Sequence, residues 1–233
     1  MKIMSFNTQS CTNFITKKID FQFIANGIKK FDADIVGLNE MRGADPESDF
    51  VNQVEELARL AGYEYFYFSK ACDIEDDDGP FGNGVLSKYP LKTIETIGIP
   101  DPTEKTGNQL YETRAVLKVT LDNGLTVLIT HFGLNSDEHI NAVKTVLNCL
   151  EKEKCVFMGD LNVEPDNEVL KPIQSCLVDT ATVIGKDLLS FPSDKPYKKI
   201  DYIFVTPDVK IISADIPNII CSDHRPHLAE IEF

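Results

Sequence analysis

The sequence predicts an α/β protein. Segments rich in β-branched and aromatic residues alternate along the chain with segments whose apolar residues recur at helical spacing, which is the pattern of sheets covered by helices. Several strand-like segments are apolar on both faces, so we expect them to be covered on both sides. Short polar clusters follow the ends of the apolar runs, and polar groups gathered from separate strand ends are typical of a functional site.

Seven segments are predicted strands, because they are short and rich in Val, Ile, Phe and Tyr. In chain order they are residues 2–6, 34–38, 114–121, 125–130, 155–158, 200–205 and 227–233.

Three helices are predicted between the strands, because apolar residues recur three and four positions apart. The first runs from about Lys17 to Phe31, although Gly27 weakens it; the second follows Ser48 and ends at Gly62. The apolar faces are Phe21, Ile24 and Ile28 in the first, Phe50, Val54, Leu57, Ala58 and Ala61 in the second, and Ile140, Val143, Leu147 and Leu150 in the third. The acidic run from Asp73 to Asp78 is expected to be a surface loop, and its glycine falls one place too late for an EF-hand.

The composition indicates one domain spanning residues 1–233, because 42% of the residues are hydrophobic and no linker-like stretch interrupts the chain. The 23 basic and 37 acidic residues give a formal charge of -14. This charge disfavours nonspecific binding to long nucleic acids, which depends on neutralising phosphates. One basic cluster, Lys195, Lys198 and Lys199, lies near the motifs below and is either a solvated loop or a phosphate-steering patch.

The cysteines do not predict a disulfide framework or a zinc site. All six are widely spread and no CxxC pair occurs, so they are expected to be free thiols or small buried apolar residues. The sequence has no evident signal peptide and no apolar run long enough to span a membrane. The cytoplasm is therefore the expected location by default.

Asn7 and Glu40 each close an apolar run, MKIMSFN and ADIVGLNE. A carboxylate after a buried run is costly unless it is paired or binds a cation, which favours Glu40 as a metal ligand over a surface acid. Together with Asp223, these residues offer carboxylate and amide oxygens, the donors that suit Mg²⁺.

Two further clusters carry candidate catalytic groups. Asp160 and Asn162 follow the run CVFM two residues apart, so they face the same way if the strand geometry continues, although an Asp-x-Asn step also commonly opens a turn. Asp201 begins a predicted strand and can accept a hydrogen bond from His224, which would fix the tautomer of the imidazole and raise its basicity. No chemistry is assigned to His139 or His227.

These motifs resemble the endonuclease/exonuclease/phosphatase superfamily of metal-dependent phosphoesterases. The resemblance rests on the closing residues of MKIMSFN and GLNE, on Gly159-Asp160-Leu161-Asn162, on Ile200-Asp201-Tyr202-Ile203-Phe204 and on Ser222-Asp223-His224, with His131 after LTVLIT. It runs from Asn7 to His224 and implies a DNase I-like fold, a four-layered sandwich of two packed mixed β-sheets flanked by helices.

The resemblance also implies roles for individual residues. Glu40 corresponds to the principal metal ligand and His224 to a general base paired with Asp201, while the division of water activation between His224 and Asp160 stays open. His131 matches a histidine carried by DNase I and bacterial sphingomyelinases, and it would protonate the leaving oxygen; a lone histidine at a strand end is otherwise usually structural.

Two more positions match residues that contact substrate in the family. Arg114 corresponds to a position that can contact the scissile phosphate, and the alternative is a strand-end salt bridge with Glu112 or another acid. Asn83, in Phe81-Gly82-Asn83-Gly84, resembles the Gly-Asn segment of sphingomyelinase-like members, and the alternative is an ordinary tight turn.

The sequence therefore predicts a hydrolase that uses Mg²⁺ or Mn²⁺ to cleave a phosphoester, with a diester favoured, by in-line attack of an activated water. A small molecule or lipid head group is favoured as substrate over a long nucleic acid. One alternative is a nuclease or abasic-site endonuclease, which the acidic charge and His131 disfavour. The other is a noncatalytic regulator that retains the fold, which the complete set of polar positions disfavours. The oligomeric state is not predicted.

Overall fold

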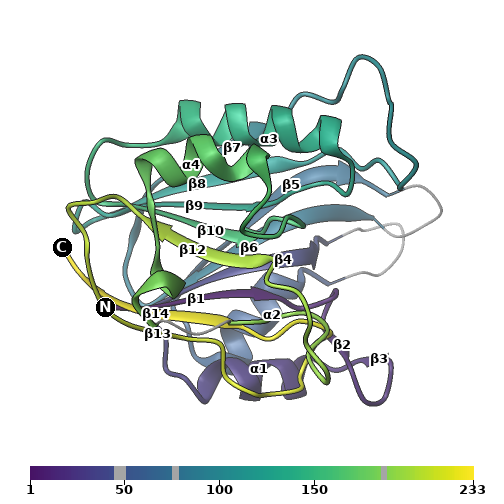
Figure 1. Cartoon of the computed structure of the whole chain (residues 1–233). Helices are drawn as coiled ribbons and strands as arrows, with labels where there is room; N and C mark the ends of the chain where they lie inside the picture. Colours follow the sequence, from purple (N-terminus) through teal and green to yellow (C-terminus); the bar gives the residue numbers. More distant parts are fainter. Residues whose placement is uncertain (45–50, 75–78, 185–187) are drawn as a thin grey trace.

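Two six-stranded mixed sheets pack face to face, and helices cover their outer faces, which gives four layers (Figure 1). The computed structural model describes residues 1–44, 51–74, 79–184 and 188–233. In order across the sheet, sheet 1 contains β13 (Lys210–Asp215), β14 (His227–Glu232), β1 (Lys2–Asn7), β4 (Ile35–Arg42), β6 (Pro80–Ser87) and β5 (Tyr65–Asp73). Sheet 2 contains β11 (Val178–Asp179), β12 (Asp201–Val205), β10 (Cys155–Asp160), β9 (Thr126–His131), β8 (Ala115–Leu121) and β7 (Leu91–Gly98).

Each sheet has one parallel pair of strands at its centre. In sheet 1 this pair is β1 and β4, in sheet 2 it is β9 and β10, and the remaining neighbours run antiparallel. Parallel strands end at the same edge of a sheet, which is where ligands bind in open α/β sheets. The polar residues at the ends of these four strands are thereby brought to one edge of the sandwich.

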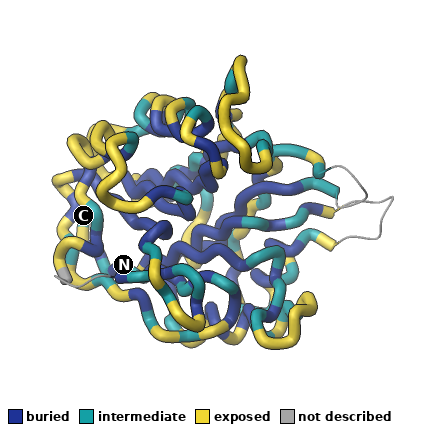
Figure 2. The backbone as a smooth tube through the Cα atoms, turned by 45° about the vertical axis from the view of Figure 1, so that its right-hand side comes forward, coloured by how far each residue is buried: buried dark blue, intermediate teal, exposed yellow. Residues whose placement is uncertain are grey.

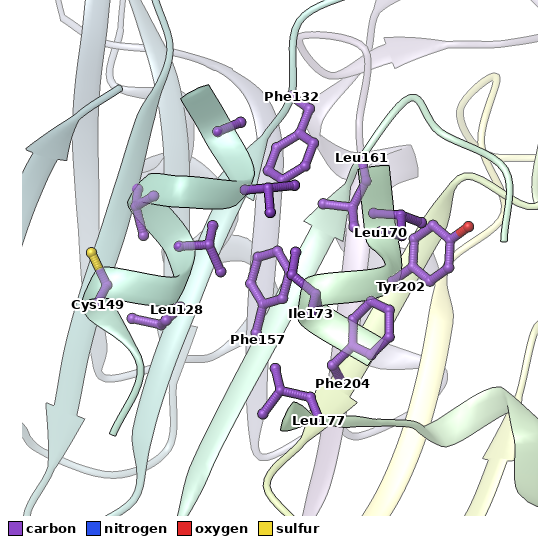
Figure 3. Packing of buried hydrophobic residues seen from close by; sticks show 14 of the residues in the cluster. Leu128, Phe132, Cys149, Phe157, Leu161, Leu170, Ile173, Leu177, Tyr202 and Phe204 are labelled. Carbon is purple, nitrogen blue, oxygen red and sulfur yellow. The ribbon is translucent and has the colours of Figure 1, made fainter. Parts of the chain in front are cut away.

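Apolar side chains fill three spaces between the four layers. The central cluster lies between the sheets and includes Ile3, Val127 and Ile203, while separate clusters lie under the helices on each outer face. Figure 2 shows the strands as the buried interior of the molecule. Figure 3 shows Phe157 and Phe204 of sheet 2 packed beneath the helices; their rings stack with centroids 5.9 Å apart.

Helices α1 (Phe21–Lys29) and α2 (Gln53–Ala61) pack on sheet 1, and α3 (Ser136–Cys149) and α4 (Lys171–Cys176) pack on sheet 2. Short elements complete the fold: the hairpin β2 (Thr12–Asn13) and β3 (Lys18–Ile19), and the 3₁₀ turns η1 (Glu168–Leu170) and η2 (Thr180–Ile184). Within the four described segments, no helix is both long and apolar enough to cross a membrane.

All three predicted helices are present, but the start of the first and the buried face of the third differ from the prediction. The first begins at Phe21 rather than near Lys17, because the Asp20 side chain caps it by accepting from the amide of Phe23. The second ends at Gly62 as predicted, in the left-handed conformation; Ser48 and Phe50 lie outside the described residues. In the third, Ile140 is 61% exposed, so its predicted place on the buried face is wrong.

All seven predicted strands are present, six of them within two residues at each end, whereas β4 continues four residues beyond its predicted end at residue 38. The sequence did not predict β2, β3, β5, β6, β7, β11 or β13. The glycines of β6 hid that strand: a side chain at Gly82 would collide with the carbonyl of Ser69, and one at Gly84 would collide with Val54. The segment Phe81–Gly84 is therefore a strand, and the tight turn is wrong. Asp73 ends β5 rather than opening a loop, and residues 75–78 lie outside the described residues.

Candidate active site

A cavity of about 320 Å³ opens at the edge where the two parallel strand pairs end. Seven of the predicted site residues line it: Glu40, Arg114, His131, Asp160, Asn162, Asp223 and His224. The other three, Asn7, Asp201 and Asn83, lie behind the wall of the cavity and are at most 2% exposed. The structure thus brings all ten predicted residues to one edge of the sandwich, seven of them in contact with the cavity.

Sheet 1 contributes Asn7 and Glu40. Asn7 ends β1, and its Nδ2 donates to Glu40 Oε1 at 2.8 Å and to Asp160 Oδ2 at 3.1 Å. Glu40 has a φ of +58° and lies where the β4–β6 ladder shifts register between Leu38 and Met41. Such a local irregularity re-aims a side chain, here toward the cavity that Glu40 lines.

The electrostatics at Glu40 suit a cation. Burial raises the pKa of the Glu40 carboxyl, and the negative charge of Asp223 raises it further. A positive ion between these two groups would remove the repulsion and reverse the rise. Asn7 Oδ1 accepts from the backbone amide of Gln9 at 3.0 Å, so in this structure Asn7 orients Glu40 and its oxygen is engaged elsewhere.

Sheet 2 contributes Asp160 and Asn162. Asp160 Oδ1 accepts from the backbone amide of Asn162 at 2.9 Å, which forms the turn expected after this strand. Burial raises the pKa of Asp160 to about 7, with Asp201 adding to the rise and His224 opposing it. This carboxyl group can therefore exchange a proton near neutral pH.

His224 and Asp201 form a buried carboxylate–imidazole pair. Nδ1 of His224 lies 2.8 Å from Oδ2 of Asp201, and Nε2 points toward Asp160, 3.5 Å from its Oδ2. Burial lowers the pKa of His224, but the surrounding carboxylates, Asp201 first among them, outweigh burial and raise it to about 10. The imidazole is therefore protonated at neutral pH.

His131 has the opposite electrostatics. Its Nδ1 lies 3.1 Å from Nη1 of Arg114, and its Nε2 lies 3.5 Å from Asp160 Oδ2 and 3.1 Å from Nδ2 of Asn162. Burial, and then the positive charges of Arg114 and His224, hold the pKa of His131 well below its usual value. Arg114 Nη1 and Asn162 Nδ2 are both donors, and a neutral imidazole has one accepting nitrogen, so the ring can accept a hydrogen bond from only one of them.

Arg114 forms the salt bridge expected with Glu112 and also lies at the cavity. Its Nη2 pairs with Glu112 at 2.5 Å, and its guanidinium also lines the cavity beside His131. Its Nε is buried and has no hydrogen-bond partner among the described residues.

Asn83 does not line the cavity. Its Oδ1 accepts from Nδ2 of Asn39 at 2.8 Å, and its Nδ2 donates to the carbonyl of Ala115 at 3.0 Å. The sequence reasoning missed Asn39, although a buried amide between an apolar run and Glu40 must find hydrogen-bond partners. It also missed Phe191, whose ring lies 4.8 Å from that of His224.

The basic cluster near Asp201 does not reach this cavity. Lys199 is buried, with Nζ 2.7 Å from Asp179 Oδ2 and 3.4 Å from the ring centroid of Tyr202. Lys198 lines a neighbouring cavity of about 520 Å³ that also contains Glu164 and Asp166. The phosphate-steering role that the sequence allowed for these lysines therefore finds no support at the catalytic edge.

The donor set fits a hard divalent cation. Glu40 and Asp223 offer carboxylate oxygens to the same cavity, and oxygen donors without a thiolate suit Mg²⁺ or Mn²⁺. Among the described residues, Asp160, Asp201 and His224 form a second group whose ligand atoms lie within 4.8 Å of one another. Within that group His224 Nδ1 lies 2.8 Å from Asp201 Oδ2, whereas the buried Oδ1 of Asp201 has no hydrogen-bond partner among the described residues.

Comparison with known families decides which proteins this chain is related to. The model of the Endonuclease/Exonuclease/phosphatase family matches residues 4–224. The chain belongs to this family. Its members hydrolyse phosphoesters and are typically dependent on divalent metals. A comparison with curated proteins found no match.

Solved structures of family members share the fold along the whole chain. An endonuclease/exonuclease/phosphatase from Beutenbergia cavernae DSM 12333 has a TM-score of 0.80 at 21% identity, covering 100% of this chain and 71% of that one. A mannosyl-6-phosphatase from Bacteroides thetaiotaomicron VPI-5482 has a TM-score of 0.78 at 15% identity, covering 100% of both chains. The human Nocturnin catalytic domain has a TM-score of 0.74 at 19% identity, covering 100% of this chain and 93% of that one. At such identities the likeness shows the fold alone.

Proposed function

We propose that this protein hydrolyses phosphoesters, with a preference for diesters, using Mg²⁺ or Mn²⁺. One observation carries the proposal: a single cavity of about 320 Å³ is lined by carboxylates, among them Glu40 and Asp223, and by cationic groups that include Arg114 and His224. The carboxylates suit a metal ion and the cationic groups suit a phosphate. A phosphoester bound between them would have both its negative charge and its reacting bond in contact with the protein.

Glu40 and Asp223 would hold the ion, with Asn7 keeping Glu40 in place through its 2.8 Å hydrogen bond. When bound, the ion would polarise a phosphoryl oxygen and offset the charge of the transition state. Arg114, whose side chain lines the cavity, would bind another phosphoryl oxygen through its guanidinium group.

We assign proton removal from the attacking water to Asp160. Its pKa of about 7 lets it accept a proton at neutral pH, whereas His224 is already protonated there. His224 would then donate from Nε2 to the charge that develops on the phosphoryl group, and Asp201 would hold the ring in place. The sequence left the division between His224 and Asp160 open, and this assignment gives His224 a role other than the general base first expected.

His131 is the candidate acid for the leaving oxygen. Its neutral state follows from burial beside two cations, and a bound phosphate anion would raise its pKa and favour protonation. Nδ1 lies 3.1 Å from Arg114, and Nε2 lies beside Asp160 and Asn162, which also line the cavity. The proton transfer would then run from His131 Nε2 to the departing oxygen.

The substrate class is proposed from size and charge. A cavity of about 320 Å³ suits a small molecule or lipid head group, and the chain charge of -14 disfavours a long polyanion. One structural relative is a mannosyl-6-phosphatase, which makes hydrolysis of a sugar phosphate, a monoester, the second candidate. A nuclease activity is the third.

A substrate screen tests the proposal. Phosphodiesters, sugar phosphates and a short oligonucleotide would be incubated with Mg²⁺, with Mn²⁺ and with excess EDTA, using the Glu40→Gln variant as the control for contaminating activity. We expect diester hydrolysis that requires the ion and is lost in the variant. Full activity in EDTA would overturn the metal assignment, and no activity on any ester with bound ion would favour the noncatalytic regulator.

A further inference from the structure

Three buried amide side chains of sheet 1, Asn7, Asn39 and Asn83, donate hydrogen bonds to sheet 2 at the catalytic edge, and Asn39 alone also accepts one from it. Asn39 belongs to β4 of sheet 1 and is fully buried. Its Oδ1 accepts from the backbone amide of Asp160 at 3.0 Å, and its Nδ2 donates to the carbonyl of Thr130 at 3.0 Å. Both of these partners belong to sheet 2. The second proton of Nδ2 goes to Asn83 Oδ1 at 2.8 Å, within sheet 1.

The orientation of this amide is determined by its neighbours. The backbone N–H of Asp160 can only donate and the carbonyl of Thr130 can only accept, so the oxygen and nitrogen of Asn39 cannot be exchanged. Asn83 is fixed in the same way, because its Nδ2 donates to the carbonyl of Ala115 at 3.0 Å. Elsewhere the space between the sheets is filled by an apolar cluster that includes Val127.

Asn39 lies between two groups of the proposed mechanism. The next residue along the chain is Glu40, whose backbone has a φ of +58°, and the amide that Asn39 holds belongs to Asp160. Asn39 therefore connects the backbone next to Glu40 with the backbone of Asp160, in addition to the side-chain connection that Asn7 makes between the two carboxyl groups. A shift of about 1 Å in such a connection is enough to disturb a catalytic arrangement.

We propose that Asn39, supported by Asn83, is a positioning residue that sets the place of Asp160 relative to Glu40. Its effect on catalysis rests on the proposed function, whereas its effect on the two carboxyl groups does not. This assignment also gives Asn83 a role other than the substrate binding expected from the sequence.

The test compares Asn39→Ala with Val127→Ala, which also removes side-chain atoms between the sheets but at the opposite end of β9. Three quantities would be measured on each full-length variant: hydrogen exchange at the amide of Asp160, affinity for Mn²⁺, and kcat and KM on the best ester. For Asn39→Ala we expect exchange about tenfold faster, because one hydrogen bond is lost. We also expect Mn²⁺ affinity or kcat to fall by about 10- to 100-fold, the usual effect of removing a group that orients ligands. Val127→Ala should lower the melting temperature without either change.

The outcomes separate this inference from the proposed function. Equal exchange and equal Mn²⁺ affinity in Asn39→Ala and wild type would overturn the positioning role, whatever the activity. Faster exchange and weaker Mn²⁺ binding in a protein that hydrolyses no ester would keep the positioning role and overturn the proposed function. If Asn39→Ala does not fold, Asn83→Ala carries the same comparison, because it removes only the partner of Nδ2 and should shift all three quantities in the same direction by less.

Discussion

The two parallel strand pairs at the sheet centres have the same topology but end in different chemistry. The β1–β4 pair of sheet 1 presents an amide and a carboxylate, Asn7 and Glu40, hydrogen-bonded to each other at 2.8 Å. The β9–β10 pair of sheet 2 ends in an imidazole and a carboxyl group, His131 and Asp160, at equivalent positions of the ladder. In the proposed function sheet 1 would help to hold the cation, and sheet 2 supplies Asp160, whose pKa is raised to about 7.

This difference teaches that one edge can combine two incompatible requirements. A cation needs carboxylates that stay charged, whereas proton transfer needs a carboxyl group with a raised pKa. Because the two carboxyl groups lie on separate sheets, burial can raise the pKa of Asp160 to about 7. A bound ion can at the same time offset the raised pKa of Glu40. The predictions below test whether ion binding and proton transfer are divided between the sheets in this way.

The largest effect is expected from Glu40→Gln, which removes the carboxylate that sheet 1 would offer to the ion. Affinity for Mn²⁺ should be mostly lost, and kcat/KM should fall about a thousandfold, because a bound metal supplies several kcal/mol and each 1.4 kcal/mol is tenfold in rate. Titration calorimetry and ester kinetics measure the two effects. The matched control is Glu164→Gln, an exposed acid in the neighbouring cavity, which should leave both unchanged. Normal Mn²⁺ affinity in Glu40→Gln would contradict the assignment.

The next largest effect is expected from variants of the buried pair formed by His224 and Asp201. Replacing His224 by Ala should lower turnover about a hundredfold, and Asp201→Asn should act in the same direction because it leaves the ring without its acceptor. The double variant should be little worse than His224→Ala, since the two residues act as one unit. Mn²⁺ affinity should survive in His224→Ala. If it is lost instead, the ion lies at Asp160, Asp201 and His224, and the division between the sheets is wrong.

A substrate-dependent effect is expected at His131. If it protonates the leaving oxygen, His131→Ala should slow diesters with poor leaving groups about a hundredfold and spare a nitrophenyl diester, whose leaving group needs little protonation. Both substrates would be measured with the same enzyme preparation, and a melting curve would serve as the control. Equal losses on the two substrates, with a lowered melting temperature, would make His131 a structural residue.

The smallest effect concerns a further contact between the sheets, at His227 of β14. Its Nδ1 lies 3.3 Å from the carbonyl of Asp201, and its Nε2 lies 3.1 Å from the hydroxyl of Thr180. Burial lowers the pKa of His227 from 6.5 to about 4. As the pH falls through this window the unfolded chain binds the proton first, so the folded state loses stability by about 1 kcal/mol per pH unit.

The variant His227→Leu lacks this titration. Its free energy of unfolding should be lower than that of wild type at pH 7, because two hydrogen bonds are lost, and the difference should shrink between about pH 6.5 and pH 4. Urea denaturation across this range measures it. A difference that stays constant with pH would show that His227 does not titrate as the buried site requires.

Local sequence patterns were sufficient to predict the strands that deliver the site, because strands such as residues 155–160 are apolar over nearly their whole length and end in polar groups. Local patterns were insufficient for β6, because close contacts require glycines there and glycine-rich segments are typical of turns rather than strands. Half-exposed strands at the sheet edges, such as β7, are also weak signals because their residues are mostly polar or exposed.

The site was predictable as a set of residues but not as an arrangement. Asn7, Asp201 and Asn83 were named with the others, yet only the fold reveals that they lie behind the cavity. The protonation of His224 depends on carboxylates brought from three separate strands or loops, so no local pattern could have indicated it. Asn39 was overlooked because its function consists of contacts with the other sheet.

The outermost strands also bear on solubility. β7 and β13 have unpaired edges that could add a strand from another molecule, but both carry charged residues, Lys92 and Glu95 in β7 and Lys210 and Asp215 in β13, and both have a register irregularity in their only ladder. Charge and irregular pairing are the means by which natural sheets resist edge-to-edge aggregation. The charged residues and the irregular pairing of β7 and β13 therefore disfavour the addition of a further strand at these two edges.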